Sequence, residues 1–338
     1  MTTTPATTGP RPLRGRRPLP LTVVLLATLA LISGCAVFGT TPTPLPAPAP
    51  SAQPTAAASS AAPVTCTNAL ASYRPSGSLP SPGDLPAGST MAKIRERGRL
   101  IAGVSADTYL LASRNPLNGR IEGFDIDMVK AIAKAIFGDE TKYELRVITA
   151  AQRIPALEDG SVDVVARAMT INCARWTQIA FSTEYYGAGQ KILVRKGSKA
   201  KTISDLNGQK VCAPNGTSSM DNLKAKAPKA VAVGADSHTG CLVLFQQGDV
   251  AAITGDDTVL AGLAAQDPYA IVPEQKAFTT EPYGIGINKR NVDLARFVNA
   301  RLEQMRSNGE WTAIYNRWLA APLGPAPAPP KAVYGRDS

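Results

Sequence analysis

The sequence predicts an α/β fold, and two observations carry this prediction. Short apolar segments with the length of buried strands alternate with segments of helical period along residues 91–320. The pattern helix, glycine, strand also occurs twice, in ALEDGSVDVVA (156–166) and in LFQQGDVAAI (244–253). Such a repeat is expected of a body with two similar lobes, although the same pattern also arises by chance in α/β proteins.

The predicted strands and helices follow one another through this body. Asp125 is the predicted cap of the first long helix, because Val129, Ile132, Ala133 and Ile136 after it fall on one helical face. The segments predicted as strands are 99–105, 143–149, 162–168, 190–196, 211–214, 230–233 and 250–254. The other segments predicted as helices are 151–159, 217–226, 239–247, 257–265 and 291–319, the last with a break at Gly309.

The composition excludes several classes of function. The 338 residues include 36 Lys and Arg, 26 Asp and Glu, and a single histidine, His238. One imidazole excludes most Ser-His-Asp, Cys-His and histidine-metal mechanisms. The five cysteines lack the spacing of zinc ligands, so we expect no metal site and no cofactor. The basic clusters at 93–99 and 195–201 are expected to be solvated surface rather than a nucleic-acid site.

The first 34 residues have the pattern of an export signal. Four arginines and no acid precede an apolar run of twelve residues, LTVVLLATLALI (21–32), which is too short to span a bilayer. The run ends in Ile32-Ser33-Gly34-Cys35, which resembles the lipobox of bacterial lipoproteins. This resemblance implies an exported chain that is lipid-anchored through Cys35 to the outer face of the cell membrane. An ordinary membrane anchor with an incidental cysteine is the alternative.

Residues 35–90 are predicted to be a tether, and residues 321–338 a loose tail. Between positions 36 and 90 the only charged residues are Arg74 and Asp84, and eleven prolines fall between 42 and 86. A segment of this composition favours extended polyproline-like conformations and cannot bury a core. The tail, APLGPAPAPPKAVYGRDS, is also rich in proline.

Six motifs spread over the body give it a resemblance to a known family. They are IEGFDID (121–127), DVVARAMTINCAR (163–175), IAFS (179–182) with the tyrosine pair 185–186, NGTS (215–218), Asp256-Asp257 and EPYGIG (281–286). In order and spacing they resemble the extracytoplasmic amino-acid-binding proteins of ABC uptake systems. Within the type II periplasmic binding proteins, these form the polar amino-acid branch, of glutamate, glutamine and aspartate type. The tether and the tail lie outside the resemblance.

The resemblance implies a two-lobed α/β binding protein with two hinge crossings. Lobe 1 would comprise 91–187 and 287–320, lobe 2 would comprise 194–279, and the crossings would fall at 188–193 and 280–286. Glycines at both crossings would allow hinge rotation. The implied function is capture of a polar L-amino acid in the cleft, acidic or its amide (glutamate, aspartate, glutamine or asparagine). An ABC permease in the membrane would receive it.

An amino-acid ligand needs a cation for its carboxylate and an acid for its ammonium, because buried charges are costly without partners. By resemblance, Arg175 grips the α-carboxylate, and a guanidinium suits bidentate pairing. A surface arginine at a helix start is the alternative. By resemblance, Asp256 takes the α-ammonium, although Asp256-Asp257 also suits a helix N-cap.

Further ligand contacts are expected around these two charges. The resemblance implies a hydroxyl from Thr170, a backbone group from Ala168 and an aromatic cover from Tyr109, for which ordinary loop packing is the alternative. The segment Gly216-Thr217-Ser218 opens a predicted helix, and the free N–H groups and dipole of a helix start suit an anion. Plain helix capping explains the same three residues.

Arg167 departs from the resemblance, because the family often has a small polar residue at this position. It lies near the end of the apolar segment 162–168, where a charge needs water, an acid or a ligand. If it faces the cleft, Arg167 adds a second positive charge beside Arg175 and favours glutamate or aspartate. An internal salt bridge to Asp163, or to an acid at the rim of the cleft, is the alternative.

Four cysteines remain for pairing once the lipobox cysteine is set aside, and they allow three arrangements. An extracytoplasmic compartment permits disulfides. Similar proteins often carry a disulfide at the positions of Cys212 and Cys241, and this pairing would leave Cys66 to pair with Cys173. His238, three residues before Cys241, is expected to be a loop residue.

Three other functions remain open on sequence alone. A sensor would bind the same ligand and present its liganded state to a membrane receptor or signalling partner. An enzyme on the same fold, such as a dehydratase of a cyclic acid, would need a general base that the sequence does not offer, so we expect no enzyme. A structural cell-wall lipoprotein would explain the tether but not the six motifs. We expect a monomer that binds no nucleic acid.

Overall fold

The structure is a computed structural model that describes residues 66–337. The expected signal peptide (1–34), the lipidation residue Cys35 and the tether up to residue 65 lie outside the described residues. None of the helices within 66–337 combines the length and the apolar character needed to cross a bilayer.

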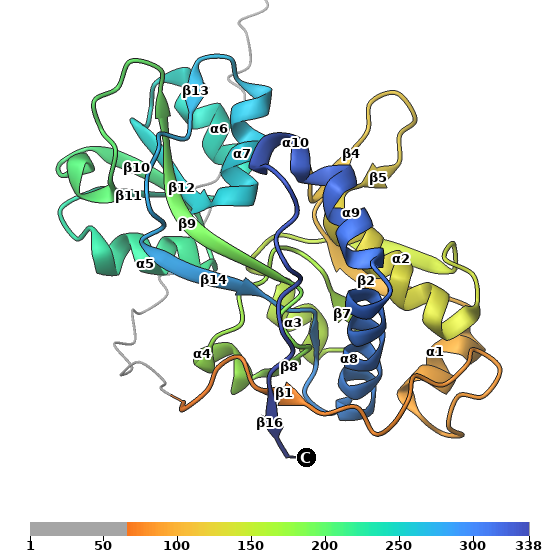
Figure 1. The fold of residues 1–338 in the computed structure, drawn as a ribbon. Coiled ribbons are helices and arrows are strands. Elements are labelled where there is room, and N and C mark those ends of the chain that lie inside the picture. Colours follow the sequence, from red (N-terminus) through yellow and green to blue (C-terminus); the bar gives the residue numbers. More distant parts are fainter. Residues whose placement is uncertain (1–65, 338) are drawn as a thin grey trace, which may run out of the picture. The chain divides into compact units, whose positions relative to one another are not determined.

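One sheet with its covering helices forms lobe 1 (Figure 1). Its strands are β2 (Leu100–Val104), β6 (Tyr143–Val147), β7 (Val164–Val165), β8 (Ile179–Phe181) and β15 (Gly286–Asn288). Its helices are α1 (Thr90–Arg97), α2 (Phe124–Phe137), α3 (Arg153–Glu158), α4 (Cys173–Trp176), α8 (Val292–Ser307) and α9 (Glu310–Trp318). The strand order is β6-β2-β7-β15-β8, with β2 parallel to β6 and β7, and β15 antiparallel to β7 and β8.

The apolar sequence segments of lobe 1 form its buried core. All five residues of β2 are buried, because helices cover the sheet. Phe124 packs against Tyr185, Tyr186 and Trp311, which joins α2 and α9 to the chain after β8. The prediction that Asp125 caps α2 is wrong. The N-cap is Gly123, with a φ of +143°, where a Cβ would lie 2.3 Å from the backbone of Leu111.

A second sheet forms lobe 2. Its strands are β9 (Tyr186–Arg195), β10 (Lys210–Pro214), β11 (Val231–Ala235), β12 (Ala252–Asp256), β13 (Ala270–Ile271) and β14 (Thr279–Tyr283). The order is β11-β10-β12-β9-β13, and β14 also pairs with β9. The helices of this lobe are η1 (Ile203–Leu206), α5 (Ser218–Lys226), α6 (His238–Gln247) and α7 (Asp257–Gln266). The disulfide Cys212–Cys241 joins β10 to α6, which confirms the first cysteine pairing.

The chain passes between the lobes twice. After β8 it enters β9, whose residues 186–190 pair with residues 279–283 of β14 in an antiparallel ribbon, and β14 leads on into β15. Residues 190–194 already belong to the sheet of lobe 2 through β12, so the first crossing begins and ends earlier than the expected 188–193. Gly284 serves close packing rather than hinge freedom, because a Cβ there would lie 2.7 Å from a side-chain carbon of Ile171.

The two terminal segments of the described chain pack on lobe 1. β1 (Ser72–Tyr73) pairs in parallel with β16 (Tyr334–Arg336), and the disulfide Cys66–Cys173 ties the start of the described chain to α4. α10 (Ala320–Leu323) follows α9 and lies near α7 of lobe 2 (Figure 1). The expectation of a loose tail is therefore wrong for residues 321–336, and the folded body begins near residue 66 rather than at 91. The second cysteine pairing is confirmed.

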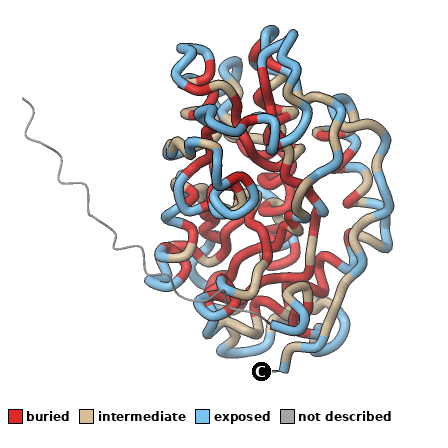
Figure 2. Tube along the Cα trace, turned by 90° about the vertical axis from the view of Figure 1, so that its left-hand side faces the viewer, coloured by how far each residue is buried: buried red, intermediate tan, exposed pale blue. Residues whose placement is uncertain are grey.

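A small sheet extends from lobe 1 between β2 and α2. It is formed by β3 (Asp107–Thr108), β4 (Ala112–Arg114) and β5 (Ile121–Glu122). Figure 2 shows the buried residues gathered in the interior and the exposed ones along the surrounding loops. A few buried residues are nevertheless charged, and several of these meet between the two lobes.

Candidate functional site

A small cavity lies between the two lobes. Its volume is about 30 Å³. Lobe 1 contributes Ser105, Thr108, Asp125, Arg153, Arg167 and Ala168, and lobe 2 contributes Thr217, Ser218, Ser219, His238, Asp256 and Val259. A cavity of this size holds only a few waters, so a larger ligand enters only when the lobes move apart.

Asp256 is the buried acid that lobe 2 supplies to the cavity. It occupies the N-cap position of α7 and is 4% exposed. Its Oδ2 accepts a hydrogen bond of 2.7 Å from the Tyr283 hydroxyl, whereas Oδ1 is buried and has no hydrogen-bond partner among residues 66–337. Burial, together with the nearby Glu281 carboxylate, raises the pKa of Asp256 to about 8. The free oxygen is thus available to a cationic or N–H donor of a ligand.

Arg153 is a buried cation that sequence reasoning missed. It begins α3, is 3% exposed, and donates to three carbonyls of lobe 1 and to the Gly216 carbonyl of lobe 2 at 3.1 Å. Burial lowers its pKa, and the charges of Arg175 and Arg167 lower it further. Its hydrogen bonds go to neutral carbonyls, so its charge is poorly compensated and favours an anionic ligand.

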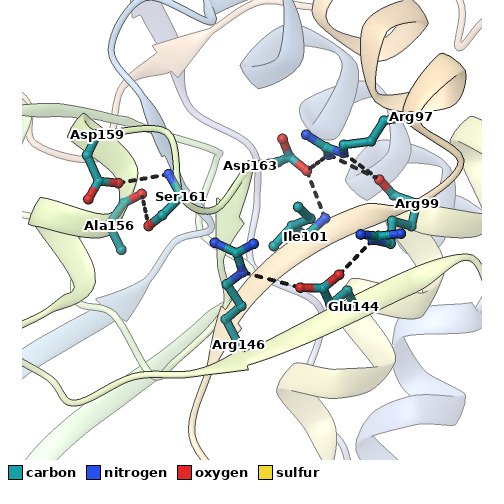
Figure 3. A network of polar contacts seen from close by, with 9 residues as sticks. All are labelled: Arg97, Arg99, Ile101, Glu144, Arg146, Ala156, Asp159, Ser161 and Asp163. Carbon is teal, nitrogen blue, oxygen red and sulfur yellow. Dashed lines mark hydrogen bonds and ion pairs between the residues drawn. The ribbon is translucent and has the colours of Figure 1, made fainter.

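Arg167 lines the same cavity. Its Nε donates to the Ile148 carbonyl at 2.9 Å. The alternative of a salt bridge to Asp163 is wrong, because that carboxylate accepts hydrogen bonds from the Arg97 guanidinium and from the Ile101 N–H (Figure 3). The second guanidinium that the sequence suggested for the cleft is therefore present there.

Asp125 and Ala168 form one wall of the cavity. Asp125 accepts hydrogen bonds from the Tyr185 hydroxyl at 2.7 Å and from the Ala168 N–H at 2.9 Å, and burial raises the pKa of Asp125 to about 6. Ala168 has a φ of +43°, a left-handed conformation that costs a residue with a Cβ about 1–2 kcal/mol. Such strain gathers at functional sites, where the surrounding structure maintains it.

His238 lies in the cavity wall rather than in a loop. It is the first residue of α6, and its Nε2 is buried without a hydrogen-bond partner in the described part of the chain. Burial, together with the Arg167 charge, lowers the pKa of His238 to about 4. The imidazole is therefore neutral at pH 7. Nothing in the sequence indicates this role, apart from His238 being the single histidine of the chain.

The first turn of α5 faces the cavity from lobe 2. Thr217 is the N-cap, and its Oγ1 accepts a hydrogen bond from the Met220 N–H at 3.2 Å. Thr217 and Ser218 both line the cavity, at the helix start expected to suit an anion. Gly216 lies just outside, and its carbonyl receives the hydrogen bond from Arg153.

Three residues implicated by the resemblance lie outside the cavity lining. Thr170 donates to Oε2 of Glu281 at 2.7 Å. Arg175 is 7% exposed, donates to the Thr170 carbonyl at 2.7 Å, and lines an adjoining hollow together with Arg153. Tyr109 is 45% exposed. The ligand roles of Thr170, Arg175 and Tyr109 stay predictions.

Glu281 is a second buried carboxylate beside the cavity, and it helps to join the lobes. It is 2% exposed. Its four hydrogen-bond donors are the side chains of Thr170, Ser218, Asn222 and Thr279. Because Thr170 belongs to lobe 1 and Ser218 to lobe 2, one carboxylate bridges the two lobes. The Thr239 hydroxyl adds a hydrogen bond of 2.7 Å from lobe 2 to the Asp107 carbonyl of lobe 1.

The charges of the cavity suit a small zwitterion. Asp256 offers a carboxylate oxygen, and Arg153 and Arg167 offer guanidinium groups on the facing lobe. A ligand with an ammonium and a carboxylate supplies the opposite charge to each side. Within residues 66–337, no group of His, Cys, Asp and Glu side chains is arranged to hold a metal ion.

The fold and the site define a class: two-lobed proteins that close on a small polar solute. Residues 100–321 match the family model of bacterial extracellular solute-binding proteins, family 3. The chain belongs to this family. The two-lobed α/β class implied by the sequence motifs is thereby confirmed, as is the resemblance itself.

Two curated relatives are amino-acid-binding proteins by name. The glutamine-binding protein GlnH of an ABC transporter of Bacillus subtilis is 39% identical over 232 residues, which are 68% of this chain and 84% of that protein. The glutamate-binding protein GluB of Corynebacterium efficiens is 30% identical over 253 residues, which are 72% of this chain and 84% of that protein.

A solved structure extends the comparison. The ancestral amino acid-binding protein AncCDT-1 superimposes with a TM-score of 0.63 and 35% identity, covering 68% of this chain and 99% of that chain. AncCDT-1 is described as a precursor of cyclohexadienyl dehydratase. The fold therefore serves binding proteins and is also connected to an enzyme.

Proposed function

We propose that the protein captures a polar L-amino acid in the interlobe cavity and delivers it to an ABC permease, with glutamate or aspartate preferred to their amides. One observation carries the proposal. Asp256, with its free buried oxygen, faces two guanidinium groups, Arg153 and Arg167, that make no ion pair within residues 66–337.

Each charge of an acidic amino acid has a complementary group at the site. Asp256 receives the α-ammonium, which keeps its carboxylate ionised in spite of burial. Arg175, in the hollow that adjoins Arg153, receives the α-carboxylate once the lobes rearrange around the ligand. Arg167 neutralises the side-chain carboxylate. The names of GlnH and GluB support a glutamine or glutamate ligand.

An amide side chain leaves one guanidinium without a charged partner. A hydrogen bond to a charged group contributes about 1.5–3 kcal/mol, against about 1 kcal/mol for a neutral one. We therefore expect glutamate to bind roughly tenfold more tightly than glutamine or better. In the closed empty cavity the guanidinium groups of Arg153 and Arg167 have no ion-pair partner within residues 66–337, so the ligand shifts the population toward closure.

Calorimetric titration of the purified full chain in detergent tests this proposal. Glutamate and aspartate are expected to bind with micromolar or tighter affinity, and arginine is expected not to bind. The variant Arg167→Gln is expected to lose at least about tenfold in affinity for glutamate and much less for glutamine. Arg290→Gln, at an exposed position of lobe 1, is the control. Equal affinity of the wild-type protein for glutamate and glutamine, or an equal loss of affinity for both ligands in the Arg167 variant, would refute the acidic preference.

The membrane attachment is also part of the proposal. Support comes from the export pattern of residues 1–34 and from the lipobox resemblance at Cys35. Metabolic labelling with a fatty acid is expected to mark the wild-type chain. Cys35→Ala is expected to lose the label and to release the protein from the membrane fraction. Retention of label by that variant would refute lipidation at Cys35.

We further infer a monomeric binding protein rather than an enzyme. The two binding-protein relatives and the complementarity of the cavity to a zwitterion support this inference. Light scattering is expected to give the mass of a single chain. Incubation with a cyclohexadienyl substrate, followed by chromatography, is expected to leave that substrate unchanged. Steady turnover that the Asp256→Asn variant abolishes would instead support an enzyme.

A further inference from the structure

Both terminal segments of the described chain are fastened to the helix that carries Arg175. We use the name terminal clasp for residues 66–74 and 333–336. These residues lie outside the span 100–321 that matches the family model. The family match therefore does not account for their contacts with α4.

The first contact of the terminal clasp is covalent. Cys66 forms a disulfide with Cys173, the first residue of α4. Arg175 follows two residues later in the same helical turn. A helix of one turn cannot maintain its own conformation in water, because the first turn of a helix is unfavourable to form. The orientation of Arg175 therefore depends on what holds α4 in place.

The second contact is a cage around Trp176, the residue after Arg175. The indole Nε1 donates to the Ala69 carbonyl at 2.8 Å. The Arg336 guanidinium lies 3.7 Å from the centroid of the Trp176 ring, and its Nε donates to the Ala71 carbonyl at 2.7 Å. Tyr73 meets the same indole edge to face at 6.0 Å. Both halves of the terminal clasp thus contact one side chain.

The terminal clasp is itself anchored in lobe 1. β1 and β16 pair in parallel, and the Ser72 hydroxyl donates to the Phe181 carbonyl at 2.7 Å. Asn299 of α8 is fully buried and donates to Ser72 Oγ at 2.9 Å and to the Tyr73 carbonyl at 2.7 Å. The clasp is therefore fixed to the core rather than lying loosely across it.

Arg175 is already oriented by this arrangement. Its N–H donates to the side chain of Asn172 at 2.9 Å, and its Nη1 donates to the Thr170 carbonyl at 2.7 Å. We propose that the terminal clasp is a positioning element, which fixes α4 and thereby aims the Arg175 guanidinium at the anionic group of the ligand. This proposal rests on the proposed function, in which Arg175 binds the α-carboxylate.

Two variants loosen the terminal clasp by different means. Cys66→Ser with Cys173→Ser removes the covalent link, and Arg336→Gln removes the cation from the Trp176 ring. Calorimetric titration of the full chain with glutamate is expected to show roughly tenfold weaker binding for each, the scale seen when an outer contact that orients a metal ligand is lost. Arg290→Gln is the charge control.

A stability control separates positioning from general destabilisation. Ile94→Val, in the buried face of α1, is expected to lower the melting temperature without changing glutamate affinity in the folded protein. A double-mutant cycle then tests the route of action. In an Arg175→Ala background, Arg336→Gln is expected to cause no further loss of affinity. Additive losses, or wild-type affinity in both clasp variants, would overturn the proposal.

Hydrogen exchange without ligand distinguishes failure of the positioning proposal from failure of the proposed function. Faster amide exchange over residues 170–177 in the clasp variants, with unchanged exchange in lobe 2, is expected. Unchanged exchange over 170–177 overturns the positioning proposal even if the wild-type protein binds glutamate. If the wild-type protein binds no amino acid, the proposed function fails, while faster exchange still supports the clasp as the support of α4.

Discussion

Replacement of Asp256 by asparagine is expected to stabilise the empty protein and to weaken its ligand binding strongly. The carboxylate is buried, and its pKa lies at about 8 instead of the ordinary 3.8. Because the pKa of this carboxyl group is raised by folding, its ionisation destabilises the folded protein with a closed cleft at every pH above 3.8, the pKa in the unfolded chain. The free-energy cost grows from pH 3.8 upward and levels off near pH 8.

The size of this cost follows from the distance between the two pKa values. At pH 7, just over three pH units above 3.8, ionisation opposes the closed empty state by up to about 4 kcal/mol. Opening of the cleft hydrates the carboxylate, so the measured gain for Asp256→Asn will be smaller. Each kcal/mol is expected to raise the melting temperature by roughly 2–4 °C. The asparagine oxygen retains the hydrogen bond from Tyr283.

Binding is expected to change in the opposite direction. The loss of one partner from a buried charge pair costs about 2–5 kcal/mol, which weakens glutamate binding by about 30-fold to several thousand-fold. Thermal melts at pH 4, 6 and 8 and calorimetric titration with glutamate measure both effects. Asp249→Asn, at an exposed position of lobe 2, is the matched control. The reasoning is refuted if Asp256→Asn binds glutamate like the wild type, or if its thermal gain is the same at pH 4 and pH 8.

Three further predictions concern the other cavity residues. Arg153→Met is expected to weaken the binding of both glutamate and glutamine by about 30-fold or more in calorimetry, because it removes a buried cation and the contact to Gly216. Unchanged binding would argue against a role of Arg153 in the site. Ala168→Val is expected to lower the free energy of unfolding by about 1–3 kcal/mol in urea titrations, because a β-branched residue tolerates a positive φ poorly. Ala168→Gly is expected to be tolerated. Equal stability of the two variants would contradict this reason. The pKa of His238 is lowered from 6.5 to about 4, so its contribution to the free energy of unfolding is fully present above pH 6.5 and is lost as pH falls toward 4. His238→Gln is therefore expected to make stability depend less on pH between 6.5 and 4. An unchanged pH dependence would contradict this assignment.

The sequence predicted the body of the fold well because buried parallel strands and amphipathic helices leave strong local patterns. The C-terminal prediction shows this clearly: a helix over 291–319 with a break at Gly309 corresponds to α8 and α9, and Gly309 adopts a φ of +80° between them. The terminal segments could not be predicted in this way. β1 and β16 are only two and three residues long and are separated by most of the chain, while their composition is that of a linker.

The site was predictable where chemistry follows a motif and not where it follows tertiary packing. Asp256 was found because it matches the acid of the family that the motifs resemble, and Arg167 because an arginine in an apolar strand is locally unusual. Arg153 was not predicted as a site residue, because the pattern of the segment RIPALE is typical of an ordinary short helix. Its burial arises only when its guanidinium meets carbonyls from another loop and from Gly216 in lobe 2. His238 was missed for the same reason.

The attachment of both ends of the described chain to lobe 1 determines which lobe is free to move. Whatever is joined upstream of Cys66 is held to lobe 1 by the bond to Cys173, and the C-terminal strand lies on the same lobe. Lobe 1 is therefore the fixed lobe, and lobe 2 is the lobe that moves relative to it about the ribbon of β9 and β14. A pair of fluorophores near the two ends of the described chain, at Thr67 and Asp337, would keep a constant separation as the cleft opens. A fluorophore at Tyr269, which is exposed on lobe 2, would change its distance from lobe 1 each time the cleft opens or closes.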